Sequence, residues 1–166
     1  LASTTLVTHA FLLTGDEKYR RWVGDYVGAW IDRAKRNGGL VPDNVGLSGK
    51  IGEYLDGKWY GGYYGWTWPH GWHHIGEQVL TAAENARLLF QDDGYVQFAR
   101  DQILRLVEEG RDEDGTRVVP YFHHDGGWDG FGPMHARFLA HLWCLSQDDG
   151  DHDLVLRLRG ARVDPA

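Results

Sequence analysis

The residues best suited to chemistry are concentrated in residues 38–74, where aromatic rings, imidazoles and glycines alternate. The ring side chains of this stretch are those of Tyr54, Trp59, Tyr60, Tyr63, Tyr64, Trp66, Trp68, His70, Trp72, His73 and His74. Flat rings beside imidazole, carboxylate and amide groups are typical of a sugar-binding cleft, because the C–H faces of a pyranose stack on rings while its hydroxyls need polar partners. The stretch therefore predicts a saccharide site.

The glycines of this stretch argue against a helix, because each costs about 1 kcal/mol relative to alanine in a helix interior. A disordered segment would be poor in aromatic residues, whereas this one is rich in them. We therefore expect an ordered, site-forming loop over residues 38–74, inserted in a single domain of residues 1–166, with short β pieces allowed between residues 38 and 70. The alternative is an aromatic loop that only closes the end of a helical core.

Two reactions on a glycosidic bond would use different residues. Hydrolysis needs two carboxyl groups, and the loops offer Asp43, Glu53, Asp56, Asp125 and Asp129. Asp129, which follows Trp128, is the best placed, although aspartate beside glycine is also common in ordinary turns. Elimination needs a base and a group that neutralises a uronate carboxylate; Asn44, Tyr63, Tyr64, His70 and Arg137 are available for these roles.

The segment from Gly65 to Gly71 carries the most specific prediction. Trp66 and Trp68 alternate through Thr67, so an extended strand would place both rings on one side as a two-ring platform. Pro69 would then fix His70 relative to that platform. We predict His70, Asp129 and Tyr64 as catalytic residues. The predicted substrate-binding residues are Asp43, Asn44, Tyr63, Trp66, Trp68, Trp72, His123 and Trp128.

The histidine runs at residues 70–74 and 123–124 also raise the question of a metal site. No HExxH motif and no pair of cysteines is present, since Cys144 is the only cysteine. Imidazoles beside tryptophans more often hydrogen-bond a substrate or a loop carbonyl. We therefore predict no metal and no cofactor.

The bulk properties restrict the partners. The formal charge of −7 and the pI near 5.6 argue against nucleic acid, whose binding requires a basic patch. No apolar run approaches the roughly 18 residues of a membrane span, so no membrane partner is expected. The expected partner is a carbohydrate substrate. The chain begins with Leu1 rather than methionine, which leaves open an upstream signal and with it a periplasmic or secreted location.

Apolar residues at helical spacing predict helices over residues 1–13, 19–34, 75–91, 93–109 and 133–145, and residues 151–159 either begin a sixth helix or form a frayed tail. The clearest pattern is that of residues 19–34. A second loop is expected over residues 111–132. Leu13-Thr14-Gly15-Asp16 recurs as Leu89-Phe90-Gln91-Asp92 and as Leu145-Ser146-Gln147-Asp148. Short turns thus join helices into pairs, and the long loops between pairs should all emerge at one end.

The repeat, together with NGGLVPDNVG and WYGGYYGWTWPHG, resembles the (α/α) toroid superfamily of carbohydrate-active enzymes, which comprises glycoside hydrolases and polysaccharide lyases. The resemblance covers residues 1–158 as repeat architecture, and its specific part is the loop 38–74. It implies an all-α fold of antiparallel helical hairpins forming part of a toroid, with long aromatic loops on one end. It also implies cleavage of glycosidic bonds in a polysaccharide or oligosaccharide, including uronate-containing ones, by hydrolysis, with elimination by a polysaccharide lyase as the alternative.

The chain carries about two and a half hairpins, fewer than such toroids normally have. An oligomer, or a missing remainder of the chain, would complete the ring. A non-catalytic sugar-binding or structural helical-repeat module is the alternative from a different functional class.

Overall fold

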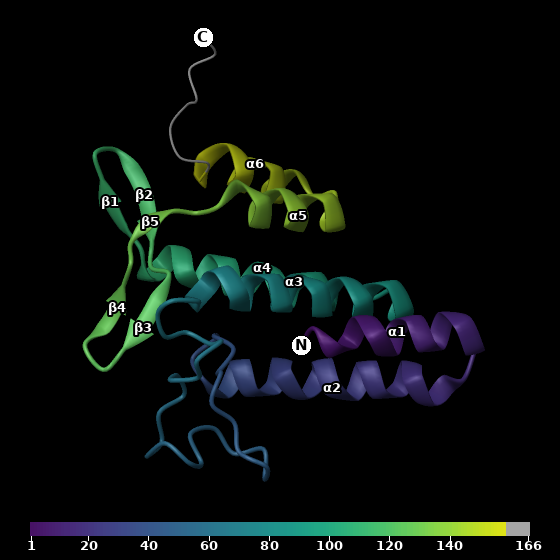
Figure 1. Cartoon of the computed structure of the whole chain (residues 1–166). Helices are drawn as coiled ribbons and strands as arrows, with labels where there is room; N and C mark the ends of the chain where they lie inside the picture. Colours follow the sequence, from purple (N-terminus) through teal and green to yellow (C-terminus); the bar gives the residue numbers. More distant parts are fainter. Residues whose placement is uncertain (159–166) are drawn as a thin grey trace.

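The computed structural model describes residues 1–158, which form helices and two small sheets (Figure 1). The helices are α1 (Ser3–Thr14), α2 (Glu17–Arg36), α3 (Gly71–Phe90), α4 (Gly94–Glu109), α5 (Ala136–Ser146) and α6 (Asp149–Leu158). The strands are β1 (Arg111–Glu113), β2 (Thr116–Val119), β3 (Phe122–His124), β4 (Gly127–Asp129) and β5 (Gly132–Pro133). Of the two alternatives for residues 151–159, the structure shows a helix, which begins two residues earlier, at Asp149; residue 159 lies outside the described residues.

The helices form three antiparallel pairs, α1 with α2, α3 with α4 and α5 with α6 (Figure 1). The first helix of each pair ends at a residue with a left-handed backbone: Gly15, Gln91 and Gln147. The following aspartate accepts a hydrogen bond from the backbone N–H two residues later: Asp16 from Lys18 (3.0 Å), Asp92 from Gly94 (2.8 Å) and Asp148 from Gly150 (2.8 Å). The recurring tetrapeptide is thus a signal for a turn between helices, and the predicted pairing of helices is confirmed.

The prediction of an all-α fold forming part of an (α/α) toroid is wrong, because residues 111–133 form strands rather than a loop. One antiparallel sheet has the order β1-β2-β5, and the other pairs β3 with β4. The β1–β2 turn is Asp114-Gly115, with φ of 47° and 76°. Asp-Gly is favoured where both turn residues need positive φ, so the sequence did carry a hairpin signal. The described residues therefore form a mixed domain of helices and small sheets.

The β pieces expected in residues 38–70 are reduced to a single isolated bridge between Val45 and Ile51 among the described residues. The helix predicted from residue 75 begins at Gly71. Its first turn is fixed by tertiary contact, since the Trp72 N–H donates to the Tyr121 carbonyl at 2.7 Å. A Cβ at Gly71 would lie 2.0 Å from that same carbonyl oxygen, so only glycine permits this approach.

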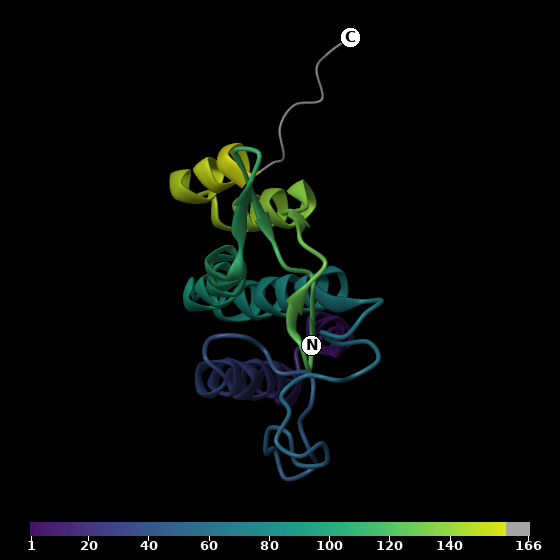
Figure 2. The same ribbon diagram turned by 90° about the vertical axis from the view of Figure 1, so that its left-hand side faces the viewer.

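The core lies around α3, which contacts every helix pair. Ala82, Ala83 and Ala86 are fully buried on α3 and let α2 and α4 approach closely. The loop 38–70 and the two β hairpins lie across one end of the helices, as the view from that end shows (Figure 2). The predicted clustering of the long connections at one end is confirmed. None of the helices in residues 1–158 has the length and apolarity that a membrane crossing requires.

Candidate functional site

The loop 38–70 is organised by the carboxylate of Asp43. Its Oδ1 accepts a hydrogen bond from the Gly62 N–H at 3.1 Å, and its Oδ2 accepts one from the Trp66 N–H at 2.5 Å. A Cβ at Gly65 would lie 1.9 Å from Oδ2, so the absence of a side chain there lets the carboxylate enter the turn. Burial raises the pKa of Asp43, and the amide donors oppose that rise.

A second set of hydrogen bonds ties the start of this loop to the core. The Trp66 indole N–H donates to the Val41 carbonyl at 2.7 Å. The Val41 N–H donates to Oε1 of Gln102 at 2.8 Å, and the amide of Gln102 donates to the Gly39 carbonyl at 2.6 Å. Gln102 is buried on α4, so these bonds satisfy its polar atoms while fixing the loop. These hydrogen bonds hold the start of the loop against α4.

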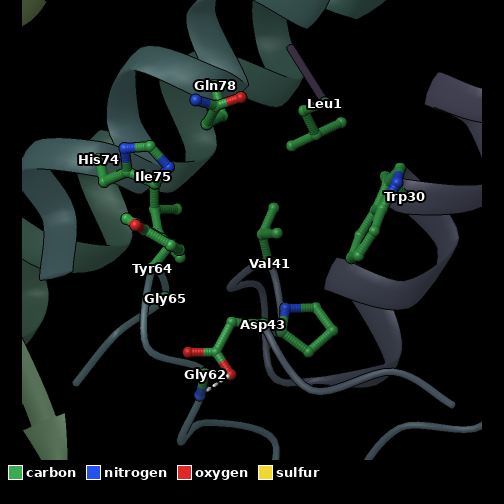
Figure 3. A pocket seen from close by; sticks show the side chains of 11 residues that line it. Leu1, Trp30, Val41, Asp43, Gly62, Tyr64, Gly65, His74, Ile75 and Gln78 are labelled. Atoms are coloured by element: carbon green, nitrogen blue, oxygen red, sulfur yellow. Dashed lines mark hydrogen bonds between the residues drawn. The ribbon is translucent and has the colours of Figure 1, made fainter. Parts of the chain in front are cut away.

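A pocket of about 330 Å³ opens between this loop and the ends of α2 and α3 (Figure 3). Its polar side chains are those of Asp43, Tyr64, His74 and Gln78, and its apolar ones are those of Leu1, Trp30, Val41, Pro42 and Ile75. Tyr64 and His74 lie on one side of the pocket, and Trp30 lies on the opposite side. We call this hollow the Asp43 pocket. It has the mixed aromatic and polar lining that a sugar ring requires.

The rings of Tyr63, Tyr64, His70 and His74 form a cluster at the edge of the pocket. The Tyr64 ring lies 4.8 Å from the His70 ring and 5.7 Å from the His74 ring, measured between centroids. Tyr63 lies 5.3 Å from His70 and is 67% exposed. His70 does not line the pocket, and although it precedes α3, its side chain makes no capping hydrogen bond. Of the predicted catalytic residues, Tyr64 lines the pocket, whereas His70 lies beside the Tyr64 ring without lining the pocket.

The predicted platform of Trp66 and Trp68 is wrong. Trp66 is fully buried, whereas Trp68 is 72% exposed, because residues 63–70 form successive turns instead of a strand. Trp72 is also fully buried, and it stacks on Trp66 at 6.1 Å between centroids. Trp66 and Trp72 are therefore core residues that hold the loop on the helices, and neither ring is accessible to a ligand.

His123 and Trp128 belong to a second aromatic group, on the β3–β4 hairpin. The His123 ring lies 4.8 Å from Trp59, 4.3 Å from Tyr60 and 4.7 Å from Trp128. Burial lowers the pKa of His123, and the neighbouring His124 adds to this effect. The Nδ1 atom of His123 is buried without a hydrogen-bond partner. This group packs the hairpin against the loop and does not line the Asp43 pocket.

Asp129 and Asn44 take structural positions. Asp129 is exposed on β4, lies 3.5 Å from Nε2 of His124, and accepts a hydrogen bond from the Gly130 N–H at 2.7 Å. It does not line the Asp43 pocket. The side-chain amide of Asn44 donates to the Lys58 carbonyl at 2.8 Å and so braces the loop. The carboxylate that the structure places in the pocket is that of Asp43.

Sequence reasoning did not select Trp30, His74 and Gln78 for the site. Trp30 lies at core spacing on α2, and this spacing favours a packing role over a site role. The available signal was its position, since the last turns of a helix that leads into a site-forming loop lie beside that loop. His74 and Gln78 are spaced four residues apart on α3 and therefore share one face of it. Among residues 1–158, no group of three or more potential metal ligands is found.

A family model described as Domain of unknown function (DUF8034) matches residues 1–120. No curated protein and no solved structure matches the chain. The matched residues include every residue that lines the Asp43 pocket, whereas β3, β4, β5, α5 and α6 lie beyond them.

Proposed function

We propose that this chain, which belongs to the family Domain of unknown function (DUF8034), is a carbohydrate-active enzyme that binds a sugar ring in the Asp43 pocket and cleaves the adjacent glycosidic bond. The observation that carries the proposal is that the Trp30 indole lies on one side of the pocket and the polar side chains of Tyr64 and His74 lie on the opposite side. A pyranose has an apolar C–H face and a rim of hydroxyls, and it needs both kinds of surface.

The size of the pocket supports a small ligand. About 330 Å³ lies at the lower end of the range for ligand sites, roughly 300 to 1,000 Å³. A single ring therefore occupies the pocket while the rest of an oligosaccharide extends outside it. Tyr64 is 63% exposed, so it can contact both the bound ring and its exposed linkage.

The chemistry available in the pocket is proton transfer. A phenol and an imidazole on one wall can donate to a leaving oxygen or accept a proton from a nucleophile. Asp43 is the one acidic side chain among the described residues that line the pocket. Hydrolysis by two carboxyl groups would therefore need a second carboxylate beside it. Elimination would need a uronate substrate and leaves an unsaturated sugar that absorbs in the near ultraviolet, so the product distinguishes the two reactions.

A second candidate function is non-catalytic saccharide binding, and one observation favours it. Both carboxylate oxygens of Asp43 accept backbone hydrogen bonds, which suits a residue that holds the loop in place. Asp43 would then shape the pocket without taking part in a reaction. Binding without turnover separates this function from the enzyme.

The test combines binding and turnover on Tyr64→Phe, His74→Gln and a matched control, Tyr54→Phe. Tyr54 is a loop tyrosine that is 65% exposed and does not line the Asp43 pocket. Saccharide binding measured by saturation-transfer NMR should weaken in the two pocket variants and remain unchanged in the control. Equal behaviour of all three variants would contradict a sugar site in this pocket.

A further inference from the structure

The charge of the Asp43 pocket indicates which class of sugar it binds, an inference that rests on the proposed function. Among residues 1–158, no lysine or arginine side chain lines the pocket, and Asp43 contributes a carboxylate. From this lining we infer that the pocket accepts an uncharged sugar ring and discriminates against uronates.

The physical argument is the cost of placing one carboxylate beside another. A bound uronate is normally paired with arginine or lysine, because a charged group that is removed from water needs an opposite charge or several donors. Here the N–H groups of Gly62 and Trp66 already donate hydrogen bonds to the Asp43 carboxylate. A uronate would therefore meet the Asp43 carboxylate in a site that offers it no lysine or arginine.

Two cations near the pocket do not supply that partner. The guanidinium carbon of Arg33 lies 5.1 Å from the Trp30 ring centroid, and Arg33 does not line the pocket. The amine of Leu1 donates toward the Tyr26 hydroxyl at 3.4 Å, and burial lowers its pKa. Gln78, which does line the pocket, is neutral, and its Oε1 accepts a hydrogen bond from the Ala2 N–H at 2.8 Å.

The experiment compares matched ligands that differ only in the C6 group. Methyl glycosides of glucose, galactose and mannose are each titrated beside the corresponding methyl uronide, at pH 8 and low salt. Affinity is measured by NMR or calorimetry on the intact chain. The neutral glycoside that binds should do so about tenfold more tightly than its uronide, the scale expected of one like-charge contact in a partly solvated site.

A gain-of-function variant tests the cause. Gln78→Lys places an ammonium in the pocket wall and should shift the ratio of uronide affinity to neutral-glycoside affinity about tenfold toward the uronide, whatever it does to the affinity for both ligands. Arg33→Gln is the matched control and should change neither affinity by more than about twofold. Asp43→Asn is avoided as the main variant, since its amide would face the N–H donors that organise the loop.

The outcomes separate the inference from the function. A uronide that binds as tightly as its neutral partner overturns the inference and leaves a sugar site intact. A Gln78→Lys variant whose ratio of uronide to neutral-glycoside affinity is unchanged shows that pocket charge does not set the preference, and it also overturns the inference. If neither series binds at millimolar concentration while the protein remains folded by circular dichroism, the proposed function itself fails.

Discussion

The backbone N–H of His123 donates to the carbonyl of Trp66 at 2.9 Å, and this bond joins the aromatic loop to the β3–β4 hairpin. The two residues are distant in sequence, yet each anchors its own segment: Trp66 is fully buried beneath the loop, and His123 packs among three aromatic rings. The hairpin therefore supports the face of the loop that does not form the Asp43 pocket.

This packing predicts loss of stability in mild acid. Because burial lowers the pKa of His123, the folded state favours the neutral imidazole. The stability that this preference contributes is fully present above the unfolded-state pKa of about 6.5 and is lost as the pH falls through the folded-state pKa. The free energy of unfolding, measured with urea, should fall from pH 8 to pH 5.

The same measurement on variants assigns the effect. His123→Phe should make the fall smaller, although His73 and His135, whose pKa values burial also lowers, should keep part of it. His9→Asn, at an exposed position on α1, should leave the fall unchanged. An equal fall in His123→Phe and the wild type would contradict the assignment.

The hydrogen bonds that Asp43 accepts from the Gly62 and Trp66 N–H groups predict a large loss of stability from a small substitution at Gly65. In Gly65→Ala the new Cβ would lie 1.9 Å from Oδ2 of Asp43, so the carboxylate must leave its amide donors. We expect a loss of about 2 kcal/mol in unfolding free energy from overpacking and broken hydrogen bonds, together with loss of ligand binding in the pocket. Gly28→Ala on α2, where nothing lies within 4 Å, should instead be neutral or stabilising by up to about 1 kcal/mol. A Gly65→Ala variant as stable as the wild type would show that the Asp43 hydrogen bonds do not stabilise the loop.

The last helix pair depends on one buried ion pair. Asp151 on α6 is 1% exposed, and its two oxygens accept hydrogen bonds from Arg100 on α4, both at 2.7 Å. Burial raises the pKa of Asp151, but the hydrogen bonds from Arg100 and Ser146 outweigh it, so the net shift is downward.

Asp151→Ala should therefore cost about 3 kcal/mol in the free energy of unfolding, because it leaves the guanidinium unpaired. Arg111→Ala, in an exposed pair with Glu113, should cost less than about 1 kcal/mol. The comparison is made by chemical denaturation at pH 7. Equal small costs would mean that the pair between α4 and α6 is solvated in solution.

The positions of His74 and His70 predict which substitution lowers turnover more. If the chain cleaves glycosidic bonds, His74→Ala should lower turnover by about 100-fold, on the usual scale for acid–base groups. His70→Ala should have a smaller effect, since His70 contacts the ring of Tyr64 from outside the pocket. Initial rates on an oligosaccharide that the wild type cleaves provide the measurement. A larger loss from His70→Ala than from His74→Ala would place the reacting group outside the Asp43 pocket.

The sequence by itself determined the helices and their pairing. The apolar spacing of residues 19–34 and the turns at Gly15, Gln91 and Gln147 act locally, since a helix and its end depend on neighbouring residues. The glycines of residues 38–70 likewise predicted a loop, and these residues form no helix. The turn at Asp114-Gly115 was equally local and could have predicted a hairpin in residues 111–119.

Only the tertiary structure decided which aromatic rings are buried and which carboxylate enters the pocket. Trp66 and Trp68 are chemically identical neighbours, and their burial differs because long-range hydrogen bonds to Val41 and His123 draw Trp66 into the core. Asp43 and Trp30 line the same pocket because the loop folds back beside α2, and the position of the loop is not encoded in the local sequence of either residue. Spacing along a chain specifies helices and turns, whereas a site assembled from a loop and two helices is specified by how they pack.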